Sequence, residues 1–148
     1  MFDNRNIFDF KVANNIDKKN HLSFILQHAY ESNGKEKGAG IILNEQYEHE
    51  NQVPVTNELG AFNMHEFNIL DGGKTALACT YKTEEADLSV LGIGVERGRV
   101  VVGGFEEIDI ATGQVIFRWS ALNHVSLLES DFSVPKSVQD TNWDWDYM

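Results

Sequence analysis

Cysteine is almost absent from this sequence of 148 residues, and with Cys79 alone no disulfide can form within the chain. No apolar run approaches the roughly 20 residues that a membrane-spanning helix needs, so no membrane span is expected. The first residues carry no basic stretch followed by an apolar one, which argues against a signal peptide and leaves the compartment unknown. Basic side chains are few, at 12 Lys and Arg against 23 Asp and Glu. The formal net charge of −11 argues against nucleic acid or an anionic membrane as a partner.

Several motifs with known chemistry are also missing. The sequence has no Gly-rich phosphate loop, no Ser-His-Asp signature and no zinc-ligand spacing. Asp140, Asp144 and Asp146 lack the ligand number and the glycine of a calcium loop, so solvated carboxylates are expected there. Neither a cofactor nor a metal ion is therefore expected. Cys79 lies in an apolar segment, where a small buried hydrophobic residue is more typical than a nucleophile.

What the sequence does contain is alternation of the kind found in β-strands. Segments 105–110 and 115–120 alternate apolar and polar residues and are rich in β-branched and aromatic types. The short loop between them ends at Gly113, a residue that accepts a positive φ angle. The two segments are predicted to form a β-hairpin.

The rest of the chain follows the same pattern. Segment 83–98 is predicted to be a long connection of mixed character, and 124–130 one or two helical turns. Pro54 suits an edge strand, because proline cannot donate a hydrogen bond to a neighbour. Two sets of four antiparallel strands result, each about the size of a propeller blade. The further strands are predicted at 8–12, 22–28, 40–44, 52–55, 64–70 and 75–81.

Three segments of the sequence stand out: M-H-E-F-N-I-L-D-G-G-K-T-A-L at 64–77, F-E-E-I-D-I-A-T-G-Q-V-I-F-R-W-S-A-L-N-H-V at 105–125, and W-D-W-D-Y at 143–147. Together they resemble the arylsulfotransferase (ASST) family, most closely its eukaryotic, mostly fungal, branch. The resemblance covers nearly the whole chain. It implies a six-bladed β-propeller with a central, histidine-lined site. It also implies transfer of a sulfuryl group from an aryl sulfate to a phenol without a nucleotide sulfate donor, and members are often secreted.

The resemblance also predicts how the chain is divided. Residues 8–56 would form a first antiparallel four-stranded blade, 64–120 a second, and 121–148 a loop leading to a third blade. The fold class expected is thus all-β, with about two blades of an incomplete ring. The family's H-x-N-S motif would begin where this sequence stops, so the chain is interpreted as an N-terminal fragment that is inactive alone.

His65 is the one residue that matches an active-site histidine of the family. The resemblance implies a role in orienting the sulfuryl group or the acceptor, while the histidine that becomes sulfated lies on a later blade. If Phe67 and Ile69 share its face, His65 begins an otherwise apolar row and could reach an axial channel. The alternative is a hydrogen-bonded histidine at a strand end.

The remaining polar candidates have structural interpretations. Glu66 and Asn68 are expected in inter-blade packing or solvent, and Arg118 in a surface or inter-blade ion pair. His124 belongs to a recurring loop segment and ranks below His65. The histidines of the first blade, which carry no motif, are His21, His28 and His49.

Two functions remain open at this point. The parent protein could be a sulfotransferase whose partners are small aromatic sulfates and phenols. Alternatively, the chain could be a non-catalytic propeller segment that serves as a scaffold or binding module. In either case exposed blade edges could lead to self-association.

Overall fold

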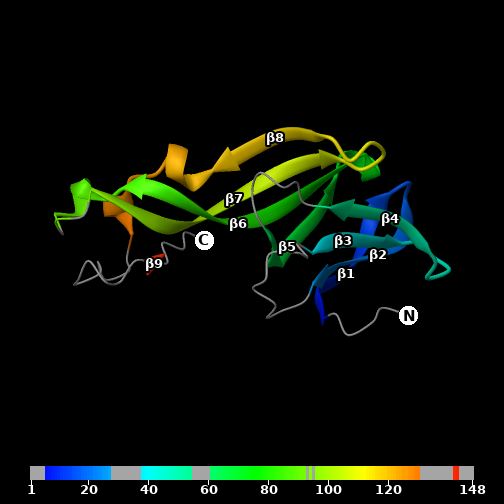
Figure 1. Ribbon diagram of the computed structural model, residues 1–148. Coiled ribbons are helices and arrows are strands. Elements are labelled where there is room, and N and C mark those ends of the chain that lie inside the picture. The colour runs from blue at the N-terminus through cyan, green and yellow to red at the C-terminus, as the bar shows by residue number, and fades with distance from the viewer. Residues whose placement is uncertain are drawn as a thin grey trace.

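The first sheet of the protein contains the four N-terminal strands, each antiparallel to the next (Figure 1). The computed structural model describes residues 6–27, 38–54, 61–92, 94, 96–130 and 142–143. In sequence and in space the order is β1 (Asn6–Ile16), β2 (Lys19–Gln27), β3 (Ala39–Leu43) and β4 (His49–Pro54). Pro54 ends the edge strand β4, as the sequence predicted.

The second sheet repeats this up-and-down order with longer strands. It contains β5 (Ala61–Leu70), β6 (Thr75–Asp87), β7 (Arg97–Asp109) and β8 (Val115–Ser120). A short strand, β9 (Asn142–Trp143), pairs in parallel with β7. The expected all-β fold with two antiparallel four-stranded sheets is therefore confirmed. The arrangement is open and is compatible with two propeller blades.

Short 3₁₀ turns join some of these strands. They are η1 (Asp71–Gly73), η2 (Ser89–Leu91), η3 (Ala121–Asn123) and η4 (Leu127–Glu129). The predicted helical turns at 124–130 thus reduce to the single turn η4, whose Ser126 and Glu129 form a capping box. None of the helical turns in the described ranges is long and apolar enough to cross a membrane.

The predicted hairpin at 105–120 is confirmed. Phe105 pairs with Trp119 and Glu107 with Phe117 across β7 and β8. Gly113 has a φ angle of 70°, which an L-residue with a side chain adopts only with strain. The hydroxyl and the backbone N–H of Thr112 both donate hydrogen bonds to the Asp109 carboxylate. These bonds hold the pKa of Asp109 below its usual value.

The predicted connection at 83–98 is wrong at both its ends, where 83–87 belong to β6 and 97–98 to β7, and only the part between them is a connection. Strands β6 and β7 stay paired up to Asp87 and Arg97, so a two-stranded ribbon extends well beyond the sheet. Its charged side chains lie in solvent, and Arg97 forms an ion pair of 3.0 Å with Glu85. Because β6 carries charged side chains on both of its faces here, its apolar alternation is weak, although Ala86 and Val100 pack into an apolar cluster on one face of the ribbon.

The two sheets pack against each other through one apolar core. Phe67 on β5 and Ile42 on β3 are both almost fully buried in it. The ring of Phe67 lies directly on the backbone of Gly40, where a β-carbon would come within 2.3 Å of the ring. The contact therefore requires glycine at this position. The buried members of the core are Ala13, Ile25, Ile42, Val53, Phe62, Phe67, Ile69, Ala76, Ala78 and Ile108.

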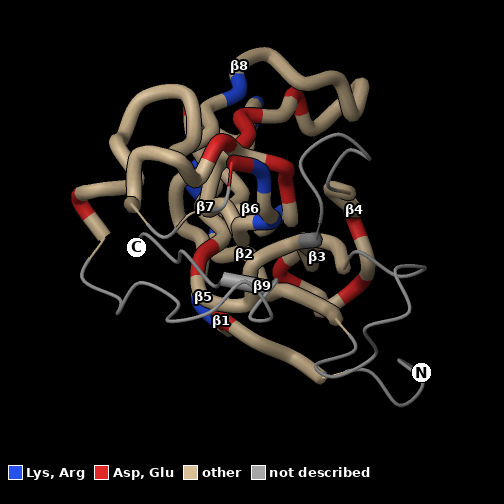
Figure 2. The backbone as a smooth tube through the Cα atoms, turned by 60° about the vertical axis from the view of Figure 1, so that its left-hand side comes forward, with Lys and Arg blue, Asp and Glu red and all other residues tan. Residues whose placement is uncertain are grey.

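A second apolar cluster lies under the far end of the β6–β7 ribbon. Val100 and Val102 of β7 contact Leu127 of η4 and Leu88 beside η2. This cluster attaches the segment after β8 to the sheet. Figure 2 shows acidic positions on both sheets rather than on a single face, so the negative charge is distributed.

Candidate functional site

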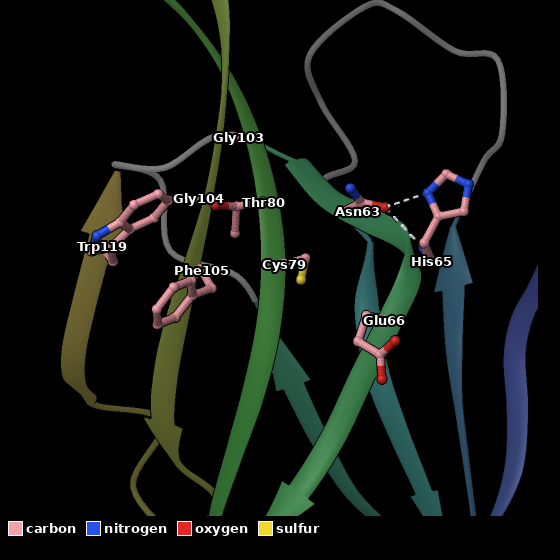
Figure 3. Close-up of a pocket in the computed structure, with 9 residues that line it drawn as sticks. All are labelled: Asn63, His65, Glu66, Cys79, Thr80, Gly103, Gly104, Phe105 and Trp119. Atoms are coloured by element: carbon pink, nitrogen blue, oxygen red, sulfur yellow. Dashed lines mark hydrogen bonds between the residues drawn. The ribbon is translucent and has the colours of Figure 1, made fainter. Parts of the chain in front are cut away.

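The hollow that contains His65 lies on the second sheet (Figure 3). Its volume is about 340 Å³, and it is open to solvent on one side. Strand β5 contributes one wall, the middle of β6 and β7 the floor, and β8 the opposite wall. Its lining residues are Asn63, His65, Glu66, Cys79, Thr80, Gly103, Gly104, Phe105 and Trp119.

A large bulge in β5 carries His65. Phe62 pairs with Thr80 and Phe67 pairs with Ala78, so four residues of β5 oppose the single residue Cys79 of β6. Such an insertion re-aims side chains and is frequent beside functional sites. The expectation that His65 shares a face with Phe67 and Ile69 is wrong, because the bulge interrupts the alternation: both of those side chains are buried and His65 is exposed.

The imidazole of His65 is held by Asn63. The Asn63 side-chain oxygen Oδ1 accepts the backbone N–H of His65 at 2.9 Å and lies 2.8 Å from Nδ1 of the same residue. Since a backbone N–H can only donate, the Asn63 atom is the acceptor oxygen, and Nδ1 must therefore carry a proton. In the neutral ring Nε2 is then left with its lone pair on the side away from Asn63 (Figure 3).

Aromatic rings form the opposite end of the hollow. The ring of Trp119 stacks on Phe105, with centroids 5.4 Å apart and planes inclined by 16°. The ring of His124 also stacks on Trp119, at 5.4 Å and 7°. Two rings therefore already stack on the indole at this end of the hollow.

Thr80 and Cys79 lie between these two ends. Thr80 is buried, while Cys79 is half-buried, so the predicted buried position of this cysteine is only partly realised. Burial raises the pKa of the Cys79 thiol, and Glu66 and Asp9 add to this effect. A thiol with a raised pKa has little thiolate at neutral pH, which agrees with the interpretation that Cys79 is not a nucleophile.

The carboxylate of Glu66 faces a cation from the first sheet. Lys11 Nζ lies 3.5 Å from Glu66 Oε1, and it donates to Asn68 Oδ1 at 2.9 Å. Glu66 and Asn68 therefore contact the first sheet through Lys11, while 51% of the Glu66 side chain remains exposed to solvent. Because Lys11 offsets the charge of Glu66, the hollow is less repulsive to an anion than its own lining residues would make it.

Arg118 lies outside the hollow, in an ion pair within the second sheet. Its Nε donates to Glu106 Oε1 at 3.0 Å, and the Glu106 side chain is fully buried. Arg118 itself is exposed, so the expectation of a surface residue in an ion pair is confirmed, while its partner is buried. Glu106 shares the buried face of β7 with Ile108. A carboxylate buried there needs an ion-pair partner, because an unpaired buried charge is costly.

Among the described residues, the other histidines do not line the hollow. His21 is buried, with Asp17 at 3.0 Å from Nε2 and Glu50 at 2.8 Å from Nδ1, and His49 is exposed on β4. His124 stacks on Trp119, which does line the hollow. His28 and the C-terminal carboxylates Asp140, Asp144 and Asp146 lie outside the described residues. Within the described ranges, no group of His, Cys, Asp and Glu is arranged to hold a metal ion.

Sequence reasoning missed two residues of the hollow that position others. Asn63 stands two residues before His65, a spacing at which an Asn side chain commonly accepts the following backbone N–H, and this signal was available in the sequence. Gly104 had no such signal. A β-carbon there would come within 2.6 Å of the Trp119 carbonyl oxygen, so glycine allows β8 to lie close beside β7.

Comparison with known proteins gives one match. A sequence model of the arylsulfotransferase (ASST) family matches residues 35–148, which is well over half of the chain. No curated protein and no solved structure matches it. The matched range includes β3 to β9 and every residue that lines the hollow. The chain therefore belongs to the arylsulfotransferase (ASST) family.

Proposed function

We propose that this chain carries part of a site that transfers a sulfuryl group from an aryl sulfate to a phenol, with His65 in contact with the sulfuryl group or the acceptor. The observation that carries the proposal is the fixed imidazole: Asn63 holds Nδ1–H, so Nε2 is presented as a single defined group. Membership of the family supports the same reaction class. No nucleotide donor is involved.

Sulfuryl transfer to a phenol has two requirements that the protein must meet. Negative charge on the sulfuryl oxygens must be stabilised in the transition state, as in phosphoryl transfer. The acceptor phenol must also lose a proton as its oxygen bonds to sulfur and the bond from sulfur to the leaving oxygen breaks. The neutral His65 ring can accept that proton at Nε2, and the protonated ring can donate a hydrogen bond to a sulfuryl oxygen.

The hollow is too poor in cationic groups to perform this reaction alone. Its lining residues include one imidazole and one hydroxyl, that of Thr80, but neither lysine nor arginine. Glu66, although offset by Lys11, adds negative charge at the same place. We therefore infer that further cationic or histidine groups from outside this hollow complete the site.

The isolated chain is expected to show no turnover of a chromogenic aryl sulfate with a phenol acceptor. The reason is that one imidazole cannot replace the set of charges that the transition state needs. The assay compares wild type with His65→Ala at high protein concentration, and both should match the blank. Turnover by wild type that disappears in His65→Ala would show that the chain is a complete enzyme.

Weak binding of an aryl sulfate should nevertheless be measurable at the hollow. We expect 4-nitrophenyl sulfate to shift the backbone amide signals of Thr80, Gly104 and His65 in a ¹⁵N spectrum. His65→Ala should weaken this binding about tenfold, the loss of one charge-assisted hydrogen bond of roughly 1.5 kcal/mol.

His49→Ala is the matched control, because this exposed histidine lies on β4 and does not line the hollow. It should leave the affinity unchanged. Equal affinities of wild type and His65→Ala would contradict the assignment of His65.

A non-catalytic role as a scaffold or binding module is the second candidate, and the scarcity of cationic groups in the hollow favours it. Strand β8, which ends the order β5-β6-β7-β8 in the second sheet, exposes Ile116 and Phe117 and could mediate self-association. The two candidates differ in the titration above. A scaffold would show no shifts confined to the hollow, whereas a partial active site would.

A further inference from the structure

We infer that Asp9, on the first sheet, is a positioning residue for His65 on the second. The inference rests on the proposed function of His65 and names what holds this histidine in place. Asp9 precedes residues 35–148, the range that the family model matches, so the comparison assigns it no role.

The starting point is the bulge in β5. Four residues, 63–66, oppose only Cys79, so this part of β5 lacks the regular ladder of backbone hydrogen bonds that fixes an ordinary strand. Its geometry must therefore be held by other groups. Near the start of the bulge, the Asn63 side chain accepts a hydrogen bond from the N–H of His65. At its end, the N–H of Phe67 donates a hydrogen bond to a side chain of the other sheet.

That group is the carboxylate of Asp9. Its Oδ2 accepts the Phe67 N–H at 2.7 Å, across 58 positions of sequence. The same oxygen lies 2.8 Å from Lys11 Nζ, and the Asp9 side chain is only 17% exposed. A charged acceptor, partly shielded from water, makes a stronger bond to a backbone N–H than a neutral group does.

Asp9 itself has an unusual backbone. Between Phe8 and Lys11, strand β1 leaves its regular register with β2, and Asp9 has a φ angle of 47°. Non-glycine residues are uncommon in this backbone region and are strained there, so the surroundings of Asp9 have to hold it in place. Here the bulge in β1 aims the carboxylate at the bulge in β5. The two irregular segments thus meet at one hydrogen bond.

Lys11 links Asp9 to two side chains of β5, those of Glu66 and Asn68. Its Nζ contacts Asp9, Asn68 and Glu66, while Asn68 Nδ2 donates to Glu66 at 2.6 Å. The residue after His65 is therefore fixed from the first sheet as well. With Phe67 N–H and Glu66 both held from β1, the His65 backbone N–H and ring can meet the same Asn63 oxygen.

The test measures which ring nitrogen of His65 carries the proton, and it does not depend on enzymatic activity. In protein labelled with ¹⁵N-histidine, the ring nitrogens report which of Nδ1 and Nε2 carries the proton, and His65 is identified by its absence in His65→Gln. Wild type should show the Nδ1–H form. Asp9→Ala should lose this preference, as Asn63→Ala does directly, and the Phe67 amide should exchange with solvent at least about tenfold faster.

Asp9→Asn should lie between wild type and Asp9→Ala, because an amide oxygen can accept the Phe67 N–H without attracting Lys11. Asp87→Ala is the control. This variant also removes a carboxylate that accepts a backbone N–H, that of Ser89 at 2.9 Å, but at the remote tip of the ribbon. It should leave the His65 signals unchanged.

The wild-type tautomer in folded Asp9→Ala would overturn the inference and leave Asp9 as a structural link only. If Asp9→Ala does not fold, the same result in Asp9→Asn would overturn it. Neither outcome depends on turnover or on aryl sulfate binding. Failure of this inference can therefore be told apart from failure of the proposed function.

Discussion

Gly40→Ala should destabilise the protein by about 2 to 3 kcal/mol, because the added methyl group has no space. A β-carbon at position 40 would lie 2.3 to 2.7 Å from three carbons of the Phe67 ring. That ring cannot move aside easily, since it is fully buried and packs edge-on against Phe62. The two sheets would have to separate locally. Urea unfolding followed by circular dichroism measures the change.

Gly98→Ala provides a matched control for this prediction. Its β-carbon would also lie 2.3 Å from a neighbour, but that neighbour is the terminal methyl carbon Cδ1 of Leu88. A leucine side chain can change rotamer, so the expected loss is below about 1 kcal/mol. Combining Gly40→Ala with Phe67→Leu should recover part of the stability lost by Gly40→Ala. Equal effects of Gly40→Ala and Gly98→Ala would contradict the close packing of Phe67 on Gly40.

Arg118→Met should cost about 2 to 3 kcal/mol of unfolding free energy, because it removes the guanidinium from the buried carboxylate of Glu106. Glu106 is fully buried, whereas the Arg118 side chain is 34% exposed. The methionine retains much of the apolar stem of arginine, so the loss reports mainly on charge. Thermal or urea unfolding of the variant at neutral pH provides the measurement.

Substitution of the other partner of the ion pair should cost less unfolding free energy. In Glu106→Gln the arginine keeps its contact with water, so the expected loss is about 1 kcal/mol. The double variant Glu106→Met/Arg118→Met should be more stable than Arg118→Met alone, because no buried charge then remains. A loss in Glu106→Gln as large as that in Arg118→Met would contradict the asymmetry in burial that underlies both expectations.

The local patterns of the sequence were sufficient for most of the strands. Alternation and turn residues identified the 105–120 hairpin and the edge strand that contains Pro54. They failed at the two ends of 83–98, because β6 carries charged residues on both of its faces there, Glu84 on one and Glu85 and Asp87 on the other. Its pairing is decided by the neighbouring strand, which a local pattern does not include.

The sequence by itself determined the all-β class, the family and the candidacy of His65, since each depends on residues close together in the chain. Only the tertiary structure decided how His65 is held and what surrounds it. The bulge in β5 exists because four residues of β5 lie opposite a single residue of β6, which only the pairing of the two strands reveals. The hydrogen bond from the Phe67 N–H to Asp9 joins residues 58 positions apart. The pairing of Glu106 with Arg118 likewise depends on the register between β7 and β8. These contacts arise when separate strands are brought together, because hydrogen bonding and burial act between neighbours in space rather than along the chain.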